Sequence, residues 1–278
     1  MKQLYQVQEV ASSIYHIFEP AGVCSTLIVG QTSALLIDTG YGFEDLSVQV
    51  RKLTDLPLQI VNTHCHLDHA GGNHFFEEVA YVHPYEKEVY RTYQLDKPGH
   101  LDFVRKKFQN GKIENPFAET FDSEDYIQYR PVEFQDLAHG QKFDLGGRTV
   151  EAIFLPGHTK GSVAFYDDAT KTLISGDSVG GSVWMIYPQS APLTEYMEAL
   201  KWLKNHYPVE KILYSHESKV YPASLLDAVL IAVENCNPKY DKPFTHPRLG
   251  FEGYHHEEIL SEEFGIKKIH IVYSFSPS

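Results

Sequence analysis

Short apolar runs bounded by polar turn residues mark the first part of the chain. Runs of this length between turn signals are typical of strands. The strands predicted in this way span residues 14–18, 25–29, 34–37, 58–62 and 80–83. Mixed helical spacing at 43–54 predicts a helix, and a second helix is expected to begin within 73–79.

The same alternation returns in the second part of the chain. Strands are predicted at 148–155, 162–166, 172–175, 211–214 and 268–275, with the second and third forming a hairpin. Leu193, Met197, Leu200 and Leu203 repeat at helical spacing within 193–205, and 223–236 is a second apolar helix. Strands that alternate with helices in both parts indicate an α/β protein.

Between these parts lies a segment of different character, residues 85–134. Ten of its fifty residues are Tyr or Phe, compared with 13% aromatic residues in the whole chain. Partial helices are predicted at 85–94 and 101–109, followed by irregular chain. Long elaborations between core elements are usually functional. We therefore expect one domain, 1–278, in which residues 85–134 are an insertion. The insertion is expected to form a lid over the functional site. Its aromatic residues could equally form a core of their own.

Composition and charge narrow the class of protein. The 278 residues are 42% hydrophobic and 22% charged, as in ordinary globular domains. The net charge of −13 argues against a nucleic-acid ligand, since phosphate backbones require a basic face. It also argues against an anionic membrane surface. A small-molecule substrate is expected instead, and a homodimer is kept open.

Cysteine usage and the N-terminal residues indicate a cytoplasmic protein. Three widely spaced cysteines, Cys24, Cys65 and Cys236, do not form a disulfide framework and suit a reducing compartment. Residues 1–6 lack the apolar core of a signal peptide. No run approaches the roughly 18 apolar residues of a membrane span.

The densest chemical signal is the run THCHLDHAGG at residues 63–72, directly after a predicted buried strand. In an extended turn, alternate side chains such as His64 and His66 project to one side, whereas on a helix they would point apart. Asp68 and His69 then lie further round the turn and can reach a second metal ion. The two glycines that close the run permit a tight backbone.

Three more residues of ligand type follow apolar strands elsewhere in the chain. His158 lies in LPGHTKGS, Asp177 in ISGDS and His216 in ILYSHE. Neutral imidazoles and carboxylates are the ligands that zinc prefers. Strand ends on a shared rim would gather them, so a metal site is predicted.

These ordered motifs resemble the metallo-β-lactamase superfamily over most of the chain outside 85–134. The resemblance implies a four-layer αββα sandwich with the metal ions at one edge. It implies that His64, His66 and His158 bind one ion, that Asp68, His69 and His216 bind the other, and that Asp177 bridges them. Asp38, in an Asp-Thr-Gly turn, resembles a residue that orients the ligand loop.

The resemblance implies a binuclear hydrolase with two divalent ions, zinc first and iron or manganese as alternatives. A hydroxide that bridges the ions would attack the substrate, and Asp68 is the expected catalytic residue that orients it. The expected substrate is a small carboxylic ester, thioester or lactone. The alternatives are a phosphodiesterase, a β-lactamase-type hydrolase, or a non-catalytic metal-binding sensor. β-Lactamases of this fold lack an acidic bridge at the position of Asp177.

Cys65 and the histidine pair at residues 255–256 are expected to lie outside the metal site. Cys65 alternates with His64 and His66, so its thiol is predicted to point away from the metal ions. The pair at residues 255–256 is expected to be a surface pair that binds no metal.

Overall fold

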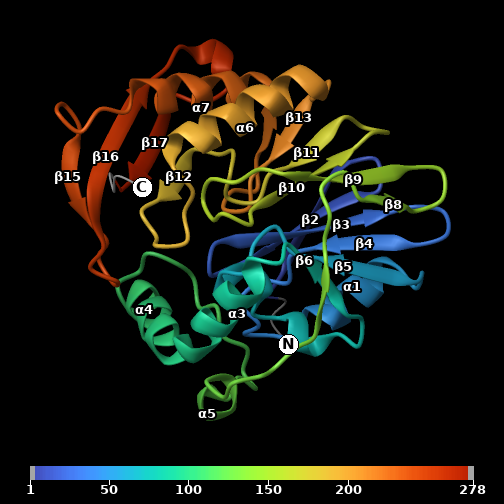
Figure 1. Ribbon diagram of the computed structural model, residues 1–278. Helices are drawn as coiled ribbons and strands as arrows, with labels where there is room; N and C mark the ends of the chain where they lie inside the picture. The colour runs from blue at the N-terminus through green and yellow to red at the C-terminus, as the bar shows by residue number, and fades with distance from the viewer. Residues whose placement is uncertain (1–3, 275–278) are drawn as a thin grey trace. The chain divides into compact units, whose positions relative to one another are not determined.

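The computed structural model describes residues 4–274, and within it the chain forms two compact units. The first comprises Met1–Val150 together with His216–Ser218, and the second comprises Glu151–Ser215 and Lys219–Ser278. Helices and strands occur in both units, which confirms the α/β class (Figure 1). The N-terminal residues 1–3 and the end of the predicted 268–275 strand lie outside the described residues.

The first unit is built on a sheet with the order β1-β2-β3-β4-β5-β6-β7. Its strands are β1 (Gln6–Ala11), β2 (Ile14–Glu19), β3 (Val23–Val29), β4 (Ala34–Ile37), β5 (Leu58–Val61), β6 (Ala80–Val82) and β7 (Phe134–Asp136). The first four pair antiparallel, and β4 to β7 pair in parallel. Because the carboxyl ends of parallel strands meet at one edge, the residues after β4 and β5 are brought together.

The five strands predicted in this part are confirmed, whereas the helix expected within 73–79 is wrong. Only a single 3₁₀ turn, η1 (Asn73–Phe75), forms there. The Asn73 amide donates to Asn62 Oδ1 at 2.8 Å and its own Oδ1 accepts from Thr39 Oγ1 at 2.7 Å. This side-chain pairing fixes the turn and stops it from extending.

Helices of the first unit pack against its apolar strands. Helix α1 (Leu46–Leu53) begins at Asp45, whose carboxylate accepts from Ser47 N at 2.9 Å, and it buries Leu46 and Val50 on one face. The other helices are α2 (Leu67–Ala70), α3 (Glu86–Leu95), α4 (Lys97–Gln109) and α5 (Ser123–Tyr126), and β8 (Lys142–Asp144) follows them.

The aromatic insertion, residues 85–134, packs against the rest of the first unit and forms one buried aromatic cluster with it. The ring of Phe43 lies 5.0 Å from Phe117 and 5.6 Å from Phe121, and the Tyr126 hydroxyl donates to Tyr41 O at 3.2 Å. Tyr90 belongs to the same buried cluster. Burial of an aromatic side chain contributes roughly 1.5–3 kcal/mol. Most of the excess Tyr and Phe is therefore explained by this packing.

The second unit contains two sheets, and the boundary between the units falls inside β9 (Thr149–Phe154). The part of the first sheet in this unit has the order β14-β13-β11-β10-β9, and the second sheet has the order β12-β17-β16-β15. The bounds are β10 (Val163–Asp167), β11 (Thr172–Ile174), β12 (Ser182–Met185), β13 (Lys211–Leu213), β14 (Val220–Pro222), β15 (Lys242–Thr245), β16 (Glu252–Ile259) and β17 (Lys268–Tyr273). The predicted β10–β11 hairpin is confirmed by its antiparallel register.

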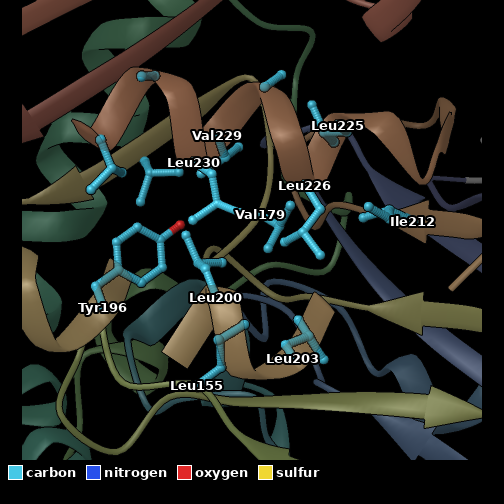
Figure 2. Close-up of a cluster of buried hydrophobic side chains, with 14 of the residues drawn as sticks. Leu155, Val179, Tyr196, Leu200, Leu203, Ile212, Leu225, Leu226, Val229 and Leu230 are labelled. Atoms are coloured by element: carbon cyan, nitrogen blue, oxygen red, sulfur yellow. The ribbon is translucent and has the colours of Figure 1, made fainter. Parts of the chain in front are cut away.

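Two helices cover the apolar side chains of the second unit, α6 (Leu193–His206) and α7 (Ser224–Asn235). Figure 2 shows Leu200 and Leu203 of α6 facing Leu226 and Val229 of α7. Their spacing of three residues puts each pair on one helix face, as the sequence predicts. Among residues 4–274, no helix is both long and apolar enough to cross a membrane.

Candidate metal centre

The loop after β5 carries four of the predicted ligands. His66 has an extended backbone directly before helix α2, and its ring lies 4.6 Å from that of His64. Asp68 and His69 lie instead in the short helix α2, in which Ala70 N donates to His66 O at 3.1 Å. Asp68 and His69 thus lie further round the turn, as predicted, and this part of the turn is helical. The helical turn places the ring of His69 4.0 Å from that of His64.

Two glycines make this turn possible, as the sequence indicates. A Cβ on Gly71 would collide with the carbonyl oxygen of Tyr41, and one on Gly72 would collide with that of Thr39. The ligand loop thus lies directly on the Asp-Thr-Gly turn that follows β4. Any side chain at these positions would push the two segments apart.

Asp38 joins that turn to the ligand loop. It has a left-handed backbone (φ 63°), a conformation that Asp and Asn adopt more readily than other residues. Its carboxylate accepts from Thr63 N at 2.7 Å and from His69 Nδ1 at 2.8 Å. The expectation that Asp38 orients the ligand loop is met by these bonds.

Replacing Asp38 by asparagine is expected to lower the affinity of this ligand group for an added divalent ion such as zinc by roughly 10–100-fold. Asparagine tolerates the left-handed backbone but removes the charge that holds the Nδ1–H of His69. Zinc affinity would be measured by competition with a chromophoric chelator. Asp45→Asn is the matched control, because asparagine caps α1 as well as aspartate does. Equal zinc affinities in the two variants would contradict the orienting role.

Asp68, His69 and His216 form a complete ligand group within the first unit. Asp68 Oδ2 lies 3.9 Å from His69 Nε2 and 3.7 Å from His216 Nε2. The three ligand atoms lie within 4.8 Å of one another, close enough to hold a metal ion. His216 is fixed by its other ring nitrogen, since Nδ1 donates to Gly22 O at 2.7 Å.

The second unit carries the two remaining ligands, His158 after β9 and Asp177 after β11. His158 Nδ1 donates to Trp184 O at 2.6 Å, and its Nε2 lies 3.5 Å from Asp177 Oδ2. Both side chains are largely buried, with 3% and 11% of their side-chain area exposed. The predicted ligands thus form a group of five in the first unit and a pair in the second.

The hydrogen bonds of three histidines fit metal binding. Nδ1 of His69, His158 and His216 each faces an oxygen acceptor, a carboxylate in the first case and a main-chain carbonyl in the other two. A neutral imidazole that donates from Nδ1 carries its lone pair on Nε2. Nε2 is also the atom of each ring that approaches a carboxylate in its own group. This arrangement is typical of metal-ligating histidines and fits divalent zinc.

Two supporting residues are not evident from the sequence. Buried Glu86 accepts a hydrogen bond from Cys65 N at 2.8 Å, which fixes the loop between the first two ligands. The ring of Tyr93, from the insertion, packs 4.4 Å from the ring of His66. The thiol of Cys65 lies in the buried apolar cluster, and burial raises its pKa well above the ordinary value. The side chain of Cys65 thus lies among apolar residues, which fits its alternation with the two histidines.

A second group of ligand type, Cys236, Asp241 and His256, lies in the second unit. His256 Nδ1 lies 2.7 Å from Asp241 Oδ1, and its Nε2 lies 3.1 Å from Glu258 Oε2. Burial alone would lower the pKa of His256, but the bonds to two carboxylates outweigh it and raise the pKa. The ring of His256 thus links two carboxylates, those of Asp241 and Glu258. The expected surface pair at residues 255–256 is in fact half-buried and hydrogen-bonded.

Comparison with known proteins identifies the family. Residues 19–216 match the model of the metallo-beta-lactamase superfamily. The human acyl-coenzyme A thioesterase MBLAC2 is 30% identical over 206 residues, which cover 68% of this chain and 71% of the relative. A hydroxyacylglutathione hydrolase of Synechococcus sp. is 27% identical over 133 residues, which cover 47% of this chain and 39% of that protein. A metallo-beta-lactamase from Pontibacter korlensis has a TM-score of 0.60 at 19% identity and covers 84% of this chain and 100% of its own, which shows the fold. The chain therefore belongs to the metallo-beta-lactamase superfamily, and it is a hydrolase.

Proposed function

We propose that this hydrolase binds two divalent metal ions, zinc first, and hydrolyses a small acyl thioester. The ligands would be His64, His66 and His158 for one ion and Asp68, His69 and His216 for the other, with Asp177 between them. The observation that carries the proposal is the common orientation of His69, His158 and His216, each of which is held by Nδ1 and offers Nε2. The two units would then act as one domain.

The relatives support a thioester rather than a lactone or a phosphodiester. One relative is named an acyl-coenzyme A thioesterase and another a hydroxyacylglutathione hydrolase, and both names describe hydrolases of acyl compounds. The acidic bridge at Asp177 argues against β-lactam hydrolysis as the main activity. Three free thiols support action in the cytoplasm.

Bound metal ions would supply an activated water and polarise the substrate carbonyl. The chain itself would position and move the proton. Asp68 is partly open to solvent, with 17% of its side chain exposed, compared with 30% for His216 and 11% for Asp177. One carboxylate oxygen faces the two histidines, which leaves the other to accept a hydrogen from the attacking water. The water oxygen bonds to the acyl carbon, the carbon–sulfur bond breaks, and the proton passes to the leaving sulfur.

The insertion supplies a further contact to this machinery. Tyr93 lies against His66, and both side chains are buried. The ring would limit the space beside the first metal ion and so form one wall of the substrate site. Tyr90 and Phe121 would act on stability instead, because their rings pack against Phe134 and Phe43 rather than against a proposed ligand.

Metal content and a substrate panel test the proposal. The protein should hold two equivalents of metal, and chelation should reduce thioester hydrolysis to background until zinc is returned. A panel of thioesters, lactones, phosphodiesters and β-lactams should give the highest kcat/KM for a thioester. No bound metal together with no hydrolysis would favour a non-catalytic sensor. Preference for a phosphodiester or β-lactam would overturn the substrate class.

A further inference from the structure

Five aromatic side chains of the second unit form a continuous surface, here called the aromatic wall. Trp184 of β12 contacts Phe244 of β15 and His246, with ring centroids 5.4 and 5.5 Å apart. Tyr187 contacts His246 at 5.7 Å and Phe251 at 6.4 Å. Four of the five are only partly buried, so part of each of these side chains is exposed to solvent.

The aromatic wall begins at a predicted metal ligand. The ring of Tyr187 meets that of His158 edge-on at 5.4 Å. The carbonyl of Trp184 accepts the hydrogen bond that fixes the same histidine, at 2.6 Å. A group bound at the inner end of the wall would therefore lie beside a proposed metal ligand.

The loop between β15 and β16 fixes the outer part of the wall. His246 N donates to Phe251 O at 2.8 Å, which closes the loop. His246 Nδ1 accepts from the main-chain nitrogens of Arg248 and Leu249 at 3.2 and 3.1 Å, so the hydrogen of the neutral ring is on Nε2. Burial lowers the pKa of His246 below its ordinary value. The ring is thus neutral at pH 7 and packs as an aromatic group.

Phe244, His246 and Phe251 lie beyond residues 19–216, the part matched by the superfamily model. The outer wall is therefore an addition to the metal-binding machinery. Uncharged aromatic surface gains free energy from contact with apolar groups and loses it when polar groups are desolvated without partners. The polar carrier of a thioester is thus disfavoured on this surface, whereas its acyl chain is favoured.

We propose that the aromatic wall binds the apolar acyl chain of the substrate, so that the enzyme prefers medium-length acyl groups to acetyl. This inference rests on the proposed thioesterase function. Each methylene that leaves water contributes up to about a fourfold gain in kcat/KM. The gain should continue while the chain still covers the wall and then level off.

A series of thioesters with one carrier thiol and acetyl, butyryl, hexanoyl and octanoyl groups tests this length dependence. In Phe251→Ala, the ratio of kcat/KM for octanoyl to that for acetyl should fall at least tenfold, while metal content stays at two equivalents. Phe251→Leu keeps an apolar side chain, so its ratio of kcat/KM for octanoyl to that for acetyl should lie between the ratios of the wild-type enzyme and Phe251→Ala. Tyr240→Ala is the control, since Tyr240 is 75% exposed and is no member of the wall.

Fluorescence gives a readout that does not require turnover. The chain has two tryptophans, so Trp202→Phe leaves Trp184 as the only one. Octanoic acid should change the Trp184 emission, and the added Phe251→Ala change should weaken its binding at least tenfold. Active enzyme with no length preference and no fluorescence response would overturn the aromatic wall and leave the thioesterase function standing. A fluorescence response without hydrolysis of any thioester would overturn the function and support the wall.

Discussion

Replacing Asp177 by alanine is expected to remove bound metal and hydrolytic activity together. Asp177 follows β11, and its Oδ2 lies 3.5 Å from Nε2 of His158. As the proposed bridge, it would serve both ions. Four ligands together bind structural zinc with roughly 10–16 kcal/mol, so the loss of one costs on the order of 3 kcal/mol, or about a hundredfold in affinity.

Metal content by mass spectrometry and thioester kinetics would be measured on the same sample. Asp168→Ala is the matched control, because Asp168 is an exposed carboxylate in the β10–β11 turn of the same unit. Thermal unfolding of the metal-free proteins separates a folding defect from a binding defect. An Asp177→Ala enzyme that retains two metal ions and full turnover would disprove the bridging role.

Replacing Asp68 by asparagine should lower kcat by roughly 10²–10⁴-fold, the usual contribution of a positioned general base. Asparagine keeps the shape of the side chain and one oxygen, but it cannot accept a proton from the attacking water. Metal binding should weaken as well, because Asp68 also belongs to the group with His69 and His216. Saturating zinc should restore occupancy and leave kcat low.

Full metal occupancy with a low kcat would show that Asp68 acts in catalysis and is not only a metal ligand. Kinetics at increasing zinc concentrations, with metal content measured in parallel, provide the comparison. Glu77→Gln is the control, since Glu77 is an exposed carboxylate near the same loop. Recovery of wild-type kcat at full occupancy would show that Asp68 only binds metal.

The core strands and the ligand motifs could be predicted from the sequence because their signals are local. β4 and β5 are short apolar runs, and Asp38 and His64 follow them within three residues. The polar strand β16 is not evident from the sequence, since none of its eight residues is fully buried and its sequence shows no alternation of apolar and polar residues. Helix α4 begins at Lys97, earlier than predicted, although a proline in its first turn is a known start signal.

Supporting contacts of the site depend on tertiary packing and leave no local signal. Glu86 resembles any charged residue of an exposed helix, yet it is 1% exposed and holds the ligand loop. Glu19 is a similar case: it accepts from Tyr41 N at 3.0 Å, and burial raises its pKa to about 8. Only the folded chain shows that these carboxyl groups lie inside.

The place of His216 in the chain has a consequence for the order of events during synthesis. His216–Ser218 belong to the first unit although the residues on both sides belong to the second. The contact of His216 with Gly22 joins residues 194 positions apart, so the loop between them must close before that ligand arrives. The free-energy cost of closing so long a loop is only slightly greater than that of closing a loop of half its length, but the closure is slow. A nascent chain on the ribosome therefore lacks the Asp68–His69–His216 group until synthesis has passed residue 216.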